Sequence, residues 1–139
     1  MTHSVRTTWK KEMLFESDVN GHKLLMDAPE ASGGKDRGPR PKPLMLAALA
    51  GCTGMDVVGI LKKMRIEPDH LEIIVEGDTA EDFPKHYTHM KVILEFHGKD
   101  LPKDKLQKAV ELSRDKYCGV SHVYKQVINI EYEIRVIEN

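Results

Sequence analysis

The only cysteines in the chain, Cys52 and Cys118, stand in two different kinds of local sequence. Cys52 lies inside a long apolar run, and Cys118 follows an amphipathic stretch and precedes Gly119. In a reducing cytosol two cysteines are more often buried residues, or a redox or catalytic pair, than a structural bridge. If the fold brings the two thiols together, they form a dithiol pair. Otherwise they are two core residues.

A nucleophilic cysteine needs a thiolate, and a thiolate in an apolar helix needs cationic or N–H support. Cys52 has no basic residue within one helical turn. Asp56, four residues on, lies on the same helix face and disfavours the thiolate. The supporting cation must therefore come from a second subunit or from elsewhere in the chain, where the candidates are Lys10, Lys11, Arg37, Arg40 and Lys42.

Cys118 at a helix end followed by Gly119 is expected to be more accessible and more mobile than Cys52. Such a position suits a resolving thiol, which must move to attack an oxidised partner. The alternative is a small hydrophobe beneath the helix terminus. Both interpretations remain open at this point.

The histidines raise a metal alternative, for which the nearest spacings are Cys118-x-x-x-His122 and His86-x-x-His89. On a strand, His86 and His89 would face opposite sides. A zinc site also needs four converging ligands. Solvated or structural histidines are the preferred interpretation, and no metal or cofactor is expected.

The elements that position these residues begin with three strands, expected near residues 4–10, 13–19 and 22–27. Asn20-Gly21 lies between the second and third and is a strong signal for a hairpin turn, because both central residues of a type I′ turn need positive φ. Residues 28–43 are rich in Pro, Gly and charge, so they form a loop. A loop this long suggests a functional edge, with a disordered connection as the alternative.

A long helix is expected from Pro43 to Met64 because proline suits the first helical position and the apolar run continues from there. Being apolar nearly all round, it should be buried on most sides. Its small residues would let other backbones approach closely; these are Ala47, Ala48, Ala50, Gly51, Gly54 and Gly59.

The remaining elements are strands over 71–78 and 87–97, a helix from Pro102 to Cys118, and a last strand over 127–136. These three strands are rich in β-branched residues and roughly alternate between apolar and polar residues, as strands with one covered face do. The order βββ-α-ββ-α-β predicts an α+β fold. No nucleotide-binding glycine motif or internal repeat is present.

A chain of 139 residues fits a single domain with a hydrophobic core. The net charge is −1 with both signs interspersed, so no nucleic-acid or membrane partner is expected. The N-terminus lacks the apolar stretch of a signal peptide, and Asp56 interrupts the best candidate for a membrane span. A soluble, cytoplasmic protein is expected.

Two segments carry a resemblance to the OsmC family of osmotically inducible and organic-hydroperoxide-resistance proteins, and most closely to its YhfA-type branch. They are Gly38-Pro39-Arg40-Pro41-Lys42-Pro43 with the helix through Cys52 to Val58, and Asp115-Lys116-Tyr117-Cys118-Gly119-Val120-Ser121. The resemblance extends over nearly the whole chain, 1–139, as one OsmC-like domain. It implies an intertwined homodimer in which two long central helices pack between sheets, with a thiol site at each subunit interface.

The resemblance also implies an activity, which is a thiol-dependent peroxidase in the oxidative stress response. Cys52 would attack an organic hydroperoxide to give a sulfenic acid, Cys118 would condense with it, and an unidentified dithiol reductant would restore the pair. Arg40, Lys42 and Asp56 are the candidates for a substrate pocket.

Three positions depart from the peroxidase branch. Lys42 stands where that branch has a glutamate, residues 13–15 stand where it has an arginine, and Gly119 replaces a proline after the second cysteine. A lysine does not reproduce the planar, bidentate support of arginine. The alternative function is therefore a non-catalytic YhfA-type dimer that binds a small apolar molecule or a protein partner.

Overall fold

The computed structural model describes residues 1–138, which form two compact units. The first unit is Met1–Met45, and the second begins at Leu46. Each unit is described by itself.

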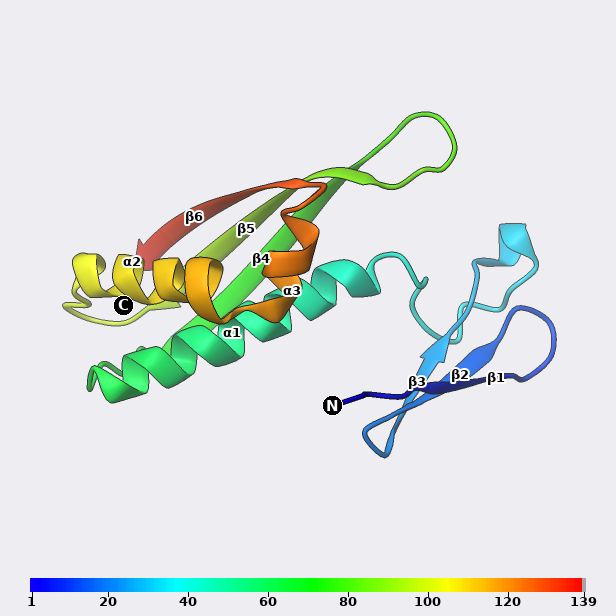
Figure 1. The fold of residues 1–139 in the computed structure, drawn as a ribbon, viewed down its shortest axis with the longest axis horizontal. Helices are drawn as coiled ribbons and strands as arrows, with labels where there is room; N and C mark the ends of the chain where they lie inside the picture. The colour runs from blue at the N-terminus through cyan, green and yellow to red at the C-terminus, as the bar shows by residue number, and fades with distance from the viewer. Residues whose placement is uncertain (139) are drawn as a thin grey trace. The chain divides into compact units, whose positions relative to one another are not determined.

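The first unit is an antiparallel sheet in the order β1-β2-β3 (Figure 1). Its elements are β1 (Arg6–Trp9), β2 (Phe15–Val19), β3 (His22–Met26) and the short helix η1 (Glu30–Ser32). The three expected strands are present, each somewhat shorter than predicted. Asn20 and Gly21 both have positive φ, at 51° and 80°, as the predicted hairpin turn requires.

The loop after β3 is organised around one carboxylate. Asp27 is 3% exposed. It accepts backbone N–H bonds from Ala28 at 2.8 Å, Lys35 at 3.2 Å and Arg37 at 3.1 Å. The Nε of Arg37 adds a fourth bond at 2.7 Å. At Gly34 a Cβ atom would lie 2.0 Å from the carbonyl oxygen of Ala28, so only glycine fits there. The disordered alternative for residues 28–43 is therefore wrong.

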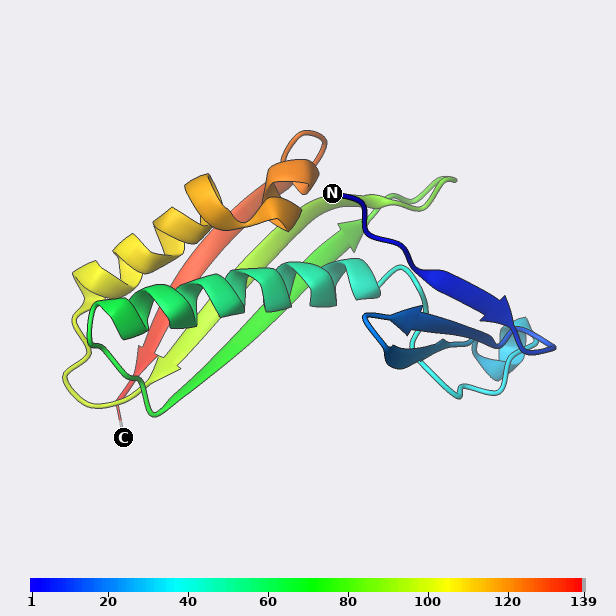
Figure 2. The same cartoon turned by 60° about the horizontal axis from the view of Figure 1, so that its bottom comes forward.

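The second unit is a three-stranded sheet in the order β4-β5-β6, covered by helices (Figures 1 and 2). Its elements are α1 (Leu44–Lys63, which begins at the end of the first unit), β4 (His70–Thr79), β5 (Tyr87–His97), α2 (Lys103–Leu112), the π-helical turn η2 (Ser113–Tyr117), α3 (Gly119–Tyr124) and β6 (Asn129–Ile137). β4 and β5 are antiparallel, whereas β5 and β6 are parallel. The helical segment from α2 to α3 makes the crossover that a parallel pair needs.

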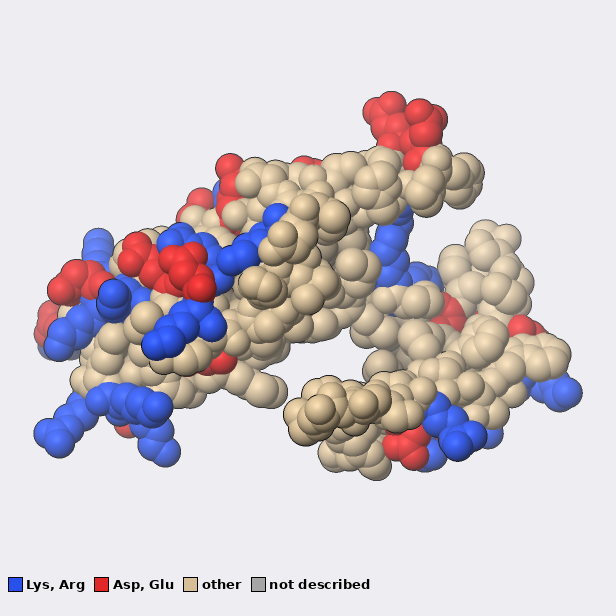
Figure 3. Space-filling model, in the orientation of Figure 1, with Lys and Arg blue, Asp and Glu red and all other residues tan. Residues whose placement is uncertain are grey.

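The core lies between one face of this sheet and the helices α1 and α2, which cover that face (Figure 2). Its fully buried side chains come from α1, β5 and α2; they are Leu49, Val57, Leu61, Met90, Val92, Leu94, Phe96, Leu106, Ala109 and Val110. β4 alternates between partly buried and exposed residues, as predicted for a strand with one covered face. Charged side chains of both signs surround α2 (Figure 3).

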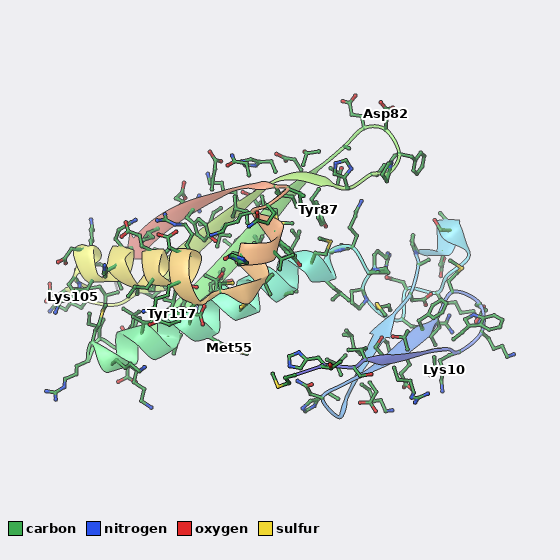
Figure 4. The ribbon with its side chains drawn as sticks, in the orientation of Figure 1. Lys10, Met55, Asp82, Tyr87, Lys105 and Tyr117 are labelled. Atoms are coloured by element: carbon green, nitrogen blue, oxygen red, sulfur yellow. The ribbon has the colours of Figure 1, made fainter. Side chains whose placement is uncertain are left out.

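The expectation that α1 is buried on most sides is wrong within one chain. Only one stripe of α1 is buried; it consists of Leu49, Thr53, Val57 and Leu61. On the other side Met55 is 81% exposed, Val58 is 55% exposed, and Met55 points away from the sheet (Figure 4). By length and composition α1 could also cross a membrane, but the core helix of a soluble protein meets the same criteria.

The small residues of α1 are used unequally within the chain. At Gly54 a Cβ atom would lie 2.9 Å from Cδ1 of Ile73, so this glycine does allow the close approach of β4. Gly51 and Gly59 have no such neighbour within 4 Å. Two of the three glycines therefore face open space on the exposed side of the helix.

The helix predicted from Pro102 to Cys118 is α2 followed by the π-helical turn η2. The N–H of Cys118 closes this turn on the carbonyl oxygen of Ser113 at 2.8 Å, a spacing of five residues. The chain then continues directly into α3, a helix that the sequence did not predict. Gly119 therefore begins a helix instead of ending one.

Candidate functional site

The fold brings the two cysteines together. Cys52 comes from the middle of α1, and Cys118 stands between η2 and α3. Their two sulfur atoms and one carboxylate oxygen of Asp56 all lie within 4.8 Å of one another. Both thiols are free. The proximity expected for a dithiol pair is thus present within one chain.

Cys118 is buried, with 3% of its surface exposed, whereas Cys52 is only partly buried. The expectation that Cys118 is the more accessible thiol is therefore wrong. The reason is α3, because Cys118 caps the N-terminus of that helix. Its Sγ accepts the backbone N–H of Ser121 at 3.3 Å, and the hydroxyl of Thr53 lies 4.0 Å away.

The two thiols differ in acidity. Burial works to raise the pKa of Cys118, but the hydrogen bonds from Ser121 and its other polar neighbours outweigh it and lower the pKa below its ordinary value. Burial raises the pKa of Cys52, and the neighbouring Cys118 and Asp56 raise it further. Cys118 is therefore the thiol whose thiolate the chain stabilises, and Cys52 is the thiol that solvent reaches.

Asp56 lies at the thiol pair because α1 places it one turn after Cys52. The hydroxyl of Ser113 donates a hydrogen bond of 2.9 Å to its Oδ2. The predicted effect of Asp56 on the Cys52 thiolate is confirmed in direction, since its negative charge contributes to the raised pKa of Cys52.

All five cations proposed for support of Cys52 belong to the first unit, and three of them, Lys10, Arg37 and Arg40, have acidic partners there. Arg37 binds Asp27, and Arg40 donates to Asp36 at 2.5 Å. Lys10 is 3.8 Å from Glu16. The assignment of Arg40 and Lys42 to a substrate pocket stays a prediction.

A different set of basic side chains lies near Cys118 in its own unit. A small pocket of about 150 Å³ borders Cys118, and Arg114, Lys116, His122 and Lys125 line it. Arg114 also binds Asp115 through two bonds of 2.7 Å. Among the described residues, the metal-ligand cluster that contains Cys118 is completed by Cys52 and Asp56, not by a histidine.

Three hydroxyl residues at this site were missed by sequence reasoning. They are Thr53, Ser113 and Ser121, and each is at most 1% exposed. The spacing Cys118-x-x-Ser121 matches an N-cap and its N3 residue, which could have predicted α3. The sequence held no comparable signal for Ser113, because its role depends on the π-helical turn and on α1 in space.

The fold and the site define a class of α+β proteins in which a long central helix and a short crossover helix bring together one partly exposed and one buried thiol. The family model for OsmC-like proteins matches residues 33–133, and the chain belongs to this family.

Individual proteins are also similar to this chain in sequence and in structure. The chain is 31% identical to Protein YhfA of Escherichia coli (strain K12) over 95% of this chain and 96% of that one. A hypothetical protein from Aquifex aeolicus VF5 has 28% identity and a TM-score of 0.87, covering all of this chain and 98% of its own. The organic hydroperoxide resistance protein OhrB of Bacillus subtilis shares the fold at 22% identity, with a TM-score of 0.68 over 97% of this chain and 98% of its own.

Proposed function

We propose that this protein is an OsmC-type thiol redox protein that reduces organic hydroperoxides through Cys52 and Cys118. The observation that carries the proposal is the approach of the two free sulfur atoms to within 4.8 Å. Family membership supports it. The name of the Bacillus subtilis OhrB protein, which shares this fold, points to the same class of substrate.

The proposed reaction divides the work between the thiols according to their surroundings. The Cys52 thiolate attacks one peroxide oxygen and the O–O bond breaks; a sulfenic acid forms on Cys52, and the alkoxide that leaves takes up the proton released by this thiol to become an alcohol. The Cys118 thiolate, supported by the N–H of Ser121, then attacks the Cys52 sulfur to form a disulfide, and the hydroxide that leaves takes up the proton released by Cys118 to become water. A dithiol reductant exchanges with this disulfide and restores both thiols.

The proposal includes a cytoplasmic homodimer that forms through the exposed face of α1. Met55 and Val58 are largely exposed there, and Gly51 has no neighbour within 4 Å. Small and apolar residues on one helix face allow a second helix to approach closely. A reducing compartment also keeps the thiol pair in the form that reacts with a hydroperoxide.

A second candidate function is a non-catalytic YhfA-type dimer that binds a small molecule. The raised pKa of Cys52 favours it, because a protonated thiol is a poor nucleophile. The Arg114–Asp115 segment lines a larger pocket of about 420 Å³ beside Ser121, which offers a place for such a ligand.

Reaction of the protein with cumene hydroperoxide distinguishes the two proposed functions. The reduced protein is mixed with the hydroperoxide, and peroxide loss is followed together with free thiols. We expect consumption of one peroxide per chain without reductant and repeated turnover with a dithiol. Cys52→Ser should abolish consumption, whereas Cys118→Ser should leave a sulfenic acid on Cys52 that a dimedone probe traps. An unchanged peroxide concentration, with both thiols still titratable, would refute the proposed peroxidase activity.

A further inference from the structure

The thiol site holds one group that a peroxidase does not need. Asp56 places a carboxylate oxygen within 4.8 Å of both sulfur atoms. A negative charge beside a nucleophilic thiol opposes formation of the thiolate. The hydroxyl of Ser113 nevertheless holds this carboxylate in place at 2.9 Å. The arrangement of two thiols and an oriented carboxylate resembles the ligand set of a metal site.

We propose that Cys52, Asp56 and Cys118 bind a zinc ion in the reduced protein. Zinc binds cysteine sulfur at about 2.3 Å and carboxylate oxygen at about 2.0–2.2 Å in tetrahedral geometry. These bond lengths put neighbouring ligand atoms roughly 3.3–3.8 Å apart. The observed separations, all within 4.8 Å, need only small side-chain rotations to reach that range.

The groups around the three ligands are those that orient a metal site. Ser113 donates to Oδ2 of Asp56 and orients the carboxylate, whose oxygens have further lone pairs for a metal. The N–H of Ser121 donates to the sulfur of Cys118. Both serines are buried, so these bonds are shielded from solvent. Outer hydrogen bonds of this kind fix the direction of metal ligands and strengthen binding.

Charge also favours a divalent cation. Two thiolates and a carboxylate in one small volume repel one another, and Zn²⁺ compensates most of that charge. When zinc binds, each thiol releases one proton as it forms its bond to the metal, and neither sulfur is oxidised. Three protein ligands leave the fourth tetrahedral position for water or another small ligand.

A second cluster of metal-binding side chains provides an internal comparison. Glu72, Glu95 and His97 lie on the opposite face of the sheet, and their ligand atoms also lie within 4.8 Å of one another. Arg135 already binds Glu95 at 3.1 Å, and no thiol is present in that cluster. Zinc prefers the site with two sulfur ligands.

The test measures zinc alone on the reduced, metal-free protein by competition with a chromophoric chelator. We expect one zinc ion per chain, and a cobalt-substituted protein should show thiolate-to-cobalt charge-transfer absorption. Cys52→Ser and Cys118→Ser should each weaken zinc binding by at least roughly 100-fold and remove that absorption. Ser113→Ala, which keeps all three ligands, should weaken it by about 10–100-fold.

His97→Asn is the matched control and should leave zinc affinity unchanged. Binding that persists in both cysteine variants but is lost in His97→Asn would overturn the proposal and place the metal on the outer face of the sheet. Absence of stoichiometric zinc in the folded wild-type protein would overturn it as well. The assay contains no hydroperoxide, so its outcome is independent of the proposed peroxidase. If both proposals hold, the zinc-loaded protein should consume no peroxide until a chelator is added.

Discussion

The chemistry of the site depends on how individual residues divide acidity and access between two thiols. Cys118 has the lowered pKa and is buried, whereas Cys52 has the raised pKa and is the more accessible. In the proposed reaction, a hydroperoxide would therefore meet the less acidic thiol first. Attack by Cys52 would depend on the small fraction of its thiolate, and the later attack by Cys118 would benefit from a thiolate that is already stabilised.

Replacing Asp56 tests this division of acidity. Asp56→Asn removes a negative charge that raises the pKa of Cys52, so more thiolate forms at neutral pH. Alkylation of Cys52 should be faster by roughly two- to fivefold, because the lower pKa also makes the thiolate somewhat less nucleophilic. The rate is measured with iodoacetamide in a Cys118→Ser background and with a chelator present.

The control for that experiment is Asp115→Asn in the same background. Asp115 is a carboxylate that Arg114 already binds, and it is not among the groups with the largest effects on the pKa of Cys52. Its replacement should leave the alkylation rate unchanged. An equal or slower rate in Asp56→Asn would contradict the role given to Asp56.

At the scale of elements, local signals determined what could be predicted. The hairpin at Asn20-Gly21 was predictable because positive φ at both turn residues has few sequence solutions. The bounds of α1 were predictable from its apolar run. α3 was missed because a glycine after a helix usually ends it, whereas Gly119 has no positive φ here and begins a new helix. The burial of Cys118 follows from α3, so it was missed for the same reason.

Convergence of Cys52, Asp56 and Cys118 was not predictable from the residues alone. Asp56 could be placed beside Cys52 from the helical period. The position of Cys118 depends on the parallel pairing of β5 with β6, which brings the crossover segment back over the sheet. Only the resemblance to the OsmC family predicted that the two thiols meet.

The loop after β3 depends on one carboxylate, and this predicts a dependence of stability on pH. The side-chain bond from Arg37 and the backbone N–H donors hold the pKa of Asp27 well below its ordinary value of 3.8. Because the pKa of Asp27 is lower in the folded state, its ionised form stabilises the fold at pH values above 3.8. This contribution to the free energy of unfolding declines as the pH falls from 3.8 toward the folded-state pKa. Asp27→Asn should therefore lower the urea midpoint at pH 7, and the difference from wild type should shrink below pH 3.8.

Asp18→Asn is the control, because Asp18 is exposed and only 3.8 Å from the exposed Lys23. Its urea midpoint should follow that of the wild type at both pH values. A difference between wild type and Asp27→Asn that stays constant as the pH falls would show that the loop does not depend on the charge of Asp27.

At the scale of the whole molecule, α1 has a face that one chain does not cover. Its buried stripe serves the core, while Met45, Met55 and Val58 are exposed and the two glycines Gly51 and Gly59 face open space. Glycine lowers helix stability by about 1 kcal/mol relative to alanine unless close packing offsets the loss. Contact with a second copy of α1 would supply that packing. It would also cover the exposed side chains of Met55 and Val58, which come after Cys52 in the same helix.

The proposed homodimer therefore makes a prediction that light scattering after gel filtration can check. The wild-type protein should have twice the chain mass, and the double variant Met55→Lys with Val58→Lys should be monomeric. Each replaced side chain loses about 1.5–3 kcal/mol of apolar burial at the interface, so dissociation should become at least roughly 100-fold easier.

Lys105→Glu is the control, because it changes an exposed charge on α2 (Figure 4) and should leave the dimer intact. Circular dichroism should show that both variants stay folded, because neither change touches the core between α1, α2 and the sheet. A wild-type protein that remains monomeric at high concentration would refute the dimer and leave the exposed face of α1 to a different partner.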